Sequence, residues 1–182
     1  MFPAPFRVVL DANVLYPFTL RDTLLRAAAA AYYQAYWSAD ILDEVFRNLI
    51  ASAGVSVEQA QRLRDAMQAA FPEATVVDYA HLVPVMTNHP KDRHVVAAAV
   101  RIGAQLVVTN NLRDFGSLPE GIDARSPDEF LCDLFHLAPV RMIELLRRQA
   151  AALRRPPITF EHLGDVLGRM APRFAQLIAQ GD

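Results

Sequence analysis

Short apolar runs rich in β-branched residues alternate along the chain with longer segments whose apolar residues recur every three or four positions. The short runs predict strands at residues 6–10, 36–38, 74–78 and 105–109, with a weaker fifth at 123–126. The longer segments predict helices in the first two thirds of 19–36 and at 39–54, 56–72 and 91–103, and a further helix begins at "SPDEF". Strands that alternate with helices form a parallel sheet with both faces covered, so the pattern predicts an α/β fold with four to five strands.

Residues typical of helix ends stand at several of these predicted boundaries. Thr19 is the predicted N-cap of the first helix, with Asp22 in the position that completes a capping box. Ser56 is the predicted N-cap of a later helix, and Gly54 and Gly103 follow two predicted C-terminal ends. We therefore expect these helices to begin and end at these residues.

The C-terminal part of the chain predicts helices without intervening strands. Residues 138–155 place apolar side chains on one stripe, at Val140, Ile143, Leu146, Ala150 and Leu153. Two shorter amphipathic segments, 159–170 and 172–180, follow and are set apart by prolines. We therefore divide the chain into a domain at 1–135 and a C-terminal helical extension at 136–182.

The composition predicts a folded protein. Hydrophobic residues make up 53% of the chain and charged residues 21%, which is enough apolar material for a packed core. Cys132 is the only cysteine, so no intrachain disulfide can form, and we interpret it as a small core residue. The first ten residues do not resemble a signal peptide, and no run reaches the ~20 apolar residues of a membrane span, so we expect a cytoplasmic protein without membrane contact.

Charge is distributed unevenly along the sequence. The formal net charge is −2, but residues 136–182 hold seven arginines and four acids, which leaves −5 for residues 1–135. A nucleic-acid-binding protein usually shows a basic face, and the net charge argues mildly against one. An acidic centre that binds divalent cations would hide such a face in the net count.

Four acidic residues stand close to predicted strand ends, where ligands gather in parallel sheets. Asp11 follows the first strand, Glu44 lies in the helix after the second, Asp92 begins the helix before the fourth, and Asp114 follows the fourth. Each also has a structural interpretation. Asp11 can cap a turn or pair with a cation, Asp92 can serve a helix terminus, and Glu44 and Asp114 can be solvated surface acids.

Taken together, the four acids point to a metal site. Carboxylates at neighbouring strand ends repel one another unless a cation lies among them. Oxygen ligands suit Mg²⁺ or Mn²⁺, which bind carboxylates, waters and phosphate oxygens. Such a cluster is what metal-assisted hydrolysis of a phosphodiester requires.

Four motifs that contain these residues resemble the PIN domain, a nuclease family known from VapC-type toxins of toxin–antitoxin pairs. They are "VVLDANVLYP", "SADILDEVFRNL", "HPKDRHVVAAAV" and "LVVTNNLRDF", and the resemblance runs from residue 6 to about 130. It implies a three-layer sandwich and an endoribonuclease that depends on Mg²⁺ or Mn²⁺, with RNA as substrate and a small antitoxin as partner. The acids of the family map onto Asp11, Glu44 and Asp92.

The sequence departs from the family pattern after the fourth strand. Asn111 stands where many relatives carry an aspartate, so it can coordinate only as a neutral amide. The resemblance therefore leaves two candidates for the fourth ligand, Asn111 and Asp114. Thr109 matches the threonine of the family, which orients a carboxylate or a phosphate, although it could equally be a plain strand residue. Asn13 is expected to support Asp11 or to cap the next turn. We interpret His89 as a loop residue, because Mg²⁺ does not favour histidine.

Other functions are compatible with the same residues. A PIN-like fold could bind RNA or protein without catalysis, or process RNA in normal metabolism. A phosphoacceptor receiver domain is disfavoured, because the only lysine, Lys91, precedes a helix instead of following a strand. The arginines of the extension either solvate helix faces or contact phosphates, and the extension could instead dock a partner or a second copy of the chain.

Overall fold

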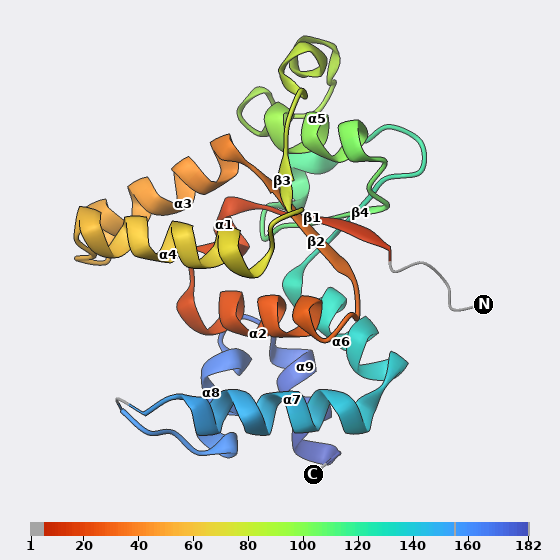
Figure 1. Ribbon diagram of the computed structural model, residues 1–182. Coiled ribbons are helices and arrows are strands. Elements are labelled where there is room, and N and C mark those ends of the chain that lie inside the picture. The colour runs from red at the N-terminus through yellow and green to blue at the C-terminus, as the bar shows by residue number, and fades with distance from the viewer. Residues whose placement is uncertain (1–5, 155, 182) are drawn as a thin grey trace.

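The computed structural model describes residues 6–154 and 156–181, and its centre is a five-stranded parallel sheet (Figure 1). The strand order is β3-β2-β1-β4-β5, with every neighbouring pair parallel. The strands are β1 (Arg7–Leu10), β2 (Gln34–Ser38), β3 (Thr75–Val76), β4 (Leu106–Val108) and β5 (Asp123–Arg125). The prediction of an α/β fold with a parallel sheet is confirmed, and the first strand lies in the middle of it.

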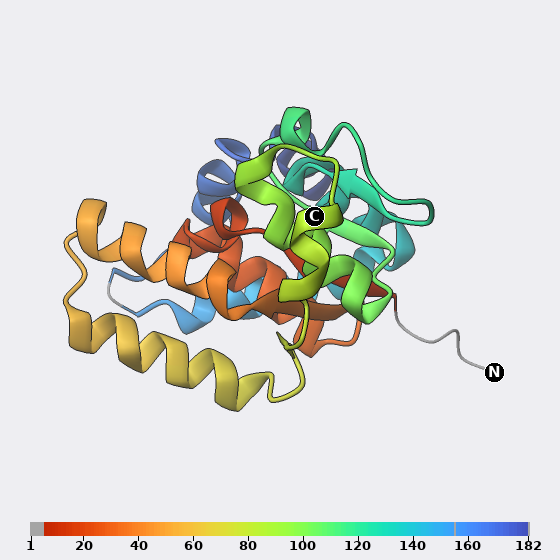
Figure 2. The same ribbon diagram turned by 90° about the horizontal axis from the view of Figure 1, so that it is seen from above.

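Helices cover both faces of the sheet, which gives the predicted three layers. Helix α5 contacts β1, β2 and β4 on one side, while α2 and α6 lie on the other (Figure 1). Helices α3 and α4 form an antiparallel pair that projects from the body of the molecule (Figure 2). The α-helices are α1 (Ala12–Leu15), α2 (Phe18–Ala29), α3 (Ala39–Ser52), α4 (Val57–Ala70), α5 (Arg93–Ile102), α6 (Pro127–Leu137), α7 (Pro139–Ala152), α8 (Phe160–Gly168) and α9 (Pro172–Gln180). The 3-10 helices are η1 (Ala80–Val85), η2 (Pro90–Asp92) and η3 (Leu112–Phe115).

The helix ends confirm some of the predicted caps and correct one. Ser56 caps α4 in a capping box with Gln59, and Gly103 takes a left-handed conformation after α5, with φ of +61°. Thr19 is not an N-cap, because α2 begins at Phe18 and Thr19 lies inside its first turn. Pro17 stands at the N-cap and has an extended backbone, since its ring fixes φ near the value that a helix entry needs.

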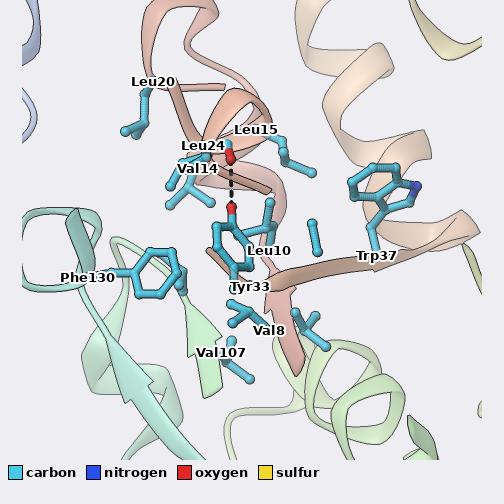
Figure 3. Packing of buried hydrophobic residues seen from close by; sticks show 14 of the residues in the cluster. Val8, Leu10, Val14, Leu15, Leu20, Leu24, Tyr33, Trp37, Val107 and Phe130 are labelled. Atoms are coloured by element: carbon cyan, nitrogen blue, oxygen red, sulfur yellow. Dashed lines mark hydrogen bonds between the residues drawn. The ribbon is translucent and has the colours of Figure 1, made fainter. Parts of the chain in front are cut away.

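An apolar core holds the central strand in place. Val8, Val9 and Leu10 are fully buried between the two helical layers. Tyr33 packs edge-on against Phe130 with ring centroids 4.9 Å apart, and its hydroxyl donates to the carbonyl of Leu24 at 2.9 Å (Figure 3). Because the only polar atom of this ring is satisfied, the core stays packed around β1, and the residue that follows β1 has a fixed position.

Helices α7, α8 and α9 form a layer beneath α2 and α6 (Figure 1). A buried hydrogen bond of 2.9 Å from Thr23 to Gln149 joins α2 to α7. Val140 was predicted inside and is 74% exposed, because the buried face of α7 instead includes Met142, Leu145 and Gln149. Cys132 is buried, as predicted. Helix α6 crosses the predicted domain boundary after residue 135, and that boundary stays a prediction.

Within the residues that the structure describes, no helix has the length and hydrophobicity needed to cross a membrane.

Candidate active site

Asp11 lies at the carboxyl end of the central strand and is only 4% exposed. Its Oδ1 accepts a hydrogen bond from the backbone N–H of Ala12 at 2.7 Å, so Asp11 is the N-cap of α1. Its Oδ2 accepts from the Thr109 hydroxyl at 2.7 Å and from the Asn13 amide at 2.6 Å. Burial raises the pKa of Asp11, the bonds from Thr109 and Ala12 oppose this, and the charge of nearby Glu44 raises it further.

Thr109 and Asn13 hold the Asp11 carboxylate in one orientation. The Thr109 hydroxyl donates to Asp11 and accepts from the Asn13 amide and from the backbone N–H of Asn111, both at 3.0 Å. The side-chain Oδ1 of Asn13 in turn accepts from the backbone N–H of Asn110 at 2.9 Å. All of these groups have partners, and the strand ends of β1 and β4 are therefore joined through side chains.

Asp92 contrasts with Asp11, because one of its oxygens is left over. It ends η2, is 5% exposed, and stands at the N-cap of α5 without a side-chain capping bond to the described backbone. Its Oδ2 is buried and has no hydrogen-bond partner among the described residues. Burial and the charges of Asp11 and Asp114 raise the pKa of Asp92. A buried carboxylate oxygen without a partner is unfavourable, and a cation would relieve it.

Asp114 lies in η3, and Asn111 and His89 surround it. The Asn111 amide donates to the Asp114 carboxylate, so Asn111 orients this acid through its nitrogen. The backbone N–H of His89 donates to the Asp114 carbonyl at 3.1 Å, and His89 Nδ1 lies 4.0 Å from Asp114 Oδ2. One ligand atom each of His89, Asp92 and Asp114 lie within 4.8 Å of one another, so this group could hold a metal ion.

Glu44 reaches the site from α3. Its charge acts on Asp11, and its Oε1 lies 3.9 Å from Lys91 Nζ. Beside it is an open groove of about 660 Å³ that mixes acidic, basic and amide side chains. The groove is lined by Asp40, Asp43, Glu44, Arg47, Asn48, Lys91 and His94.

Of the four acids predicted from the sequence, Asp92 and Asp114 lie with His89 in the group that could hold an ion. Asp11 and Glu44 are not part of that group, and they act on their neighbours through charge, Glu44 on Asp11 and Asp11 on Asp92. The role of all four as ligands stays a prediction. Sequence reasoning missed the surroundings of Asp92. His94 Nδ1 donates to the Lys91 backbone carbonyl at 3.0 Å, and the charge of His94 lowers the pKa of Asp11. His89, interpreted as a loop residue, lies beside two of the acids. The motif "HPKDRH" could have pointed to these neighbours, because His89, Lys91 and His94 all lie within three residues of Asp92 in the sequence.

A parallel α/β sheet with carboxylates at the carboxyl end of its central strand is typical of proteins that bind a divalent cation at that position. A family model described as PIN domain matches residues 7–113, and the chain belongs to the PIN domain family. A second model, described as VapC50 C-terminal domain, matches residues 127–180. The resemblance drawn from the motifs is therefore confirmed.

A relative from Mycobacterium tuberculosis carries the name "Putative ribonuclease VapC50". It is 41% identical over 100 residues, which are 53% of this chain and 59% of that protein. The match thus spans less than two thirds of the length of this curated relative. No solved structure matches the chain.

Proposed function

We propose that this protein is a metal-dependent endoribonuclease that hydrolyses phosphodiester bonds of RNA, and that it is the toxin of a toxin–antitoxin pair. The Oδ2 of Asp92, which is buried beside Asp11 and Asp114 and has no hydrogen-bond partner among the described residues, carries the proposal, because it calls for a cation at the end of the sheet. Membership of the PIN domain family and the name of the VapC50 relative support the nuclease assignment.

Asp11, Glu44, Asp92 and Asp114 would hold Mg²⁺ or Mn²⁺, with Asn111 as a further oxygen donor or as the support of Asp114. When bound, the ion would supply a hydroxide nucleophile at neutral pH and would neutralise charge that develops on the phosphate. The chain itself contributes orientation. Asp11 needs no rearrangement, because three hydrogen bonds fix its carboxylate in the folded protein.

The groove beside Glu44 is the proposed path of the RNA strand. Lys91 is largely exposed and can turn from Glu44 toward a phosphate oxygen, and Arg47 and His94 line the same groove. Basic side chains at the edge of an acidic centre offset its repulsion of a polyanionic substrate. The partner is a small antitoxin that places a basic side chain among the carboxylates. A homodimer formed through the extension stays a prediction.

The test is cleavage of a single-stranded RNA by the purified chain. Cutting is expected with Mg²⁺ or Mn²⁺, and EDTA should abolish it until Mn²⁺ is added back. Asp11→Asn, Glu44→Gln and Asp92→Asn should each lose most of the activity, and Asp114→Asn should lose less if Asn111 takes part. The matched control is Asp65→Asn, since Asp65 is on α4 and its carboxylate accepts a hydrogen bond from Gln61 of the same helix.

Each alternative function has its own outcome in this test. Full cleavage in chelator would refute the metal-dependent mechanism. RNA binding without cleavage by any metal-loaded form would indicate a non-catalytic binding module. Cleavage by a form that is harmless on expression, with no small neighbour-encoded protein co-purifying, would indicate a housekeeping nuclease instead of a toxin.

A further inference from the structure

We infer that His89 is a direct metal ligand together with Asp92 and Asp114, and that this nitrogen donor makes the site prefer a transition-metal ion such as Mn²⁺, Co²⁺ or Zn²⁺ over Mg²⁺. The inference rests on the proposed function only in taking Asp92 and Asp114 as ligands. It adds a ligand that the acidic pattern of the sequence does not contain.

The three side chains are spaced for one ion. Ligand atoms on opposite sides of an ion at ~2.1 Å lie about 4.2 Å apart, and adjacent ones lie closer. One atom each of His89, Asp92 and Asp114 fall within 4.8 Å of one another, and His89 Nδ1 and Asp114 Oδ2 are 4.0 Å apart. Rotation of the exposed His89 side chain would bring its nitrogen closer to the two carboxylates, so that all three could share one ion.

The donor atoms are available to a ligand. Asp92 Oδ2 is buried and has no hydrogen-bond partner in the described part of the chain. The hydrogen bond that His89 Nδ1 accepts from the backbone N–H of Lys91 is long, at 3.4 Å. A bond of that length is weak, so the nitrogen lone pair can be given to a cation at small cost.

The backbone keeps the three residues together before any ion arrives. Two backbone hydrogen bonds connect them, from His89 N–H to the Asp114 carbonyl at 3.1 Å and from Asp92 N–H to the His89 carbonyl at 3.0 Å. Pro90 follows His89 and restricts its conformation, and the Asn111 amide holds the Asp114 carboxylate. A group held in this way loses little conformational freedom when it binds a cation.

The chemistry of the donor set decides which ion is favoured. Two carboxylates balance the charge of a divalent cation, and a neutral imidazole adds a nitrogen. Mg²⁺ strongly prefers oxygen ligands. Mn²⁺, Co²⁺ and Zn²⁺ also accept an imidazole nitrogen, and Mn²⁺ binds such a site more weakly than Co²⁺ or Zn²⁺. A site of two carboxylates and one histidine is therefore selective against Mg²⁺.

Metal binding without RNA tests the inference. Calorimetric titration of the full chain should give tighter binding for Mn²⁺ than for Mg²⁺. His89→Ala should weaken Mn²⁺ binding about tenfold or more and leave Mg²⁺ binding unchanged. His81→Ala is the matched control, because His81 is an exposed histidine on the neighbouring η1, and it should change neither affinity. Thermal melts establish that each variant is folded.

Spectroscopy of the wild type gives a second readout that does not depend on a variant. Electron spin echo measurements on bound Mn²⁺ should show coupling to an imidazole nitrogen. Absence of that coupling, or equal weakening of Mn²⁺ and Mg²⁺ binding in His89→Ala, would overturn the inference. If the coupling is present but RNA is not cut, the proposed function fails and this ligand assignment stands. If RNA is cut and no nitrogen coupling is found, the reverse holds.

Discussion

Neutralising Asp92 should stabilise the metal-free protein, although the residue stands at a helix N-terminus where an acid is normally favourable. Asp92 is buried, makes no capping bond to the described backbone of α5, and has one oxygen without a hydrogen-bond partner in the described part of the chain. Burial and the charges of Asp11 and Asp114 raise its pKa. In Asp92→Asn the charge is gone, and the new amide can donate to a neighbouring carboxylate.

The pH dependence follows from the direction of this shift. A carboxyl whose pKa is higher in the folded than in the unfolded state favours folding when protonated. That contribution is complete below the unfolded value of about 3.9 and is lost as pH rises through the folded pKa. The difference between wild type and Asp92→Asn should therefore be small near pH ~4 and should grow toward neutral pH.

The expected gain at neutral pH is on the order of 1 kcal/mol, the size of a single optimised charge or cap. For a chain of this length it corresponds to about 2–4 °C in Tm. Melts followed by circular dichroism in EDTA, at several pH values, measure it directly. Saturating Mn²⁺ should reverse the order, because an ion that binds only the folded wild type adds stability by mass action.

The control and the opposite outcome are both defined. Asp65→Asn should leave Tm unchanged with or without metal, since Asp65 is an exposed acid on α4 that is not part of the group that could hold an ion. The opposite outcome is that Asp92→Asn loses ~0.5–2 kcal/mol of folding stability at every pH, melts at a lower temperature, and responds to metal as the wild type does. Asp92 then serves the helix terminus alone. The reasoning about a shared acidic site would then be refuted.

Two further predictions concern single hydrogen bonds, one between α6 and α9 and one at Asp11. Asp128→Ala should destabilise the fold by about 1–2 kcal/mol, measured by chemical denaturation. The reason is that Asp128 Oδ1, on α6, accepts a hydrogen bond of 2.9 Å from the backbone N–H of Phe174 in the first turn of α9. The control Asp133→Ala, also on α6, should change little. Thr109→Val should reduce RNA cleavage strongly while the protein stays folded, since it removes the 2.7 Å bond to Asp11 Oδ2, whereas Thr109→Ser keeps the hydroxyl and should keep most activity; equal loss in both variants would contradict an orienting role.

The sheet and the positions of its terminal acids could be predicted because both depend on local pattern. A β-branched run followed by Asp11 reads the same in sequence and structure, and parallel pairing alone brings its end beside Thr109. The error at Thr19 arose because a local capping pattern competed with Pro17, which starts the helix earlier. The error at Val140 arose because α7 packs against three helices, α2, α6 and α8. A single line of apolar residues along a helix does not show which sides of it such neighbours cover.

His89 shows what sequence pattern could not supply. Its ring lies beside Asp114, which is remote in sequence, through the path of two irregular loops that carry η2 and η3. Hydrophobic periodicity contains no information about such loops, and the known preference of Mg²⁺ for oxygen argued against the histidine. The motif "HPKDRH" places His89 near Asp92 in the sequence, but only the folded structure shows that its ring also lies beside Asp114, with one ligand atom of each residue within 4.8 Å of the others.

The acids of this site have two different relations to the fold. Asp11 is satisfied by three protein hydrogen bonds, so folding alone fixes its orientation. Asp92 keeps a buried oxygen without a partner in the described chain, so folding leaves it in an unfavourable state that a cation would relieve. Since binding and folding free energies are linked, whatever stability the metal-free protein loses at Asp92 is available to the ion when it binds. The site therefore combines one carboxylate that is positioned in advance with a loop-borne group whose stability depends on the metal.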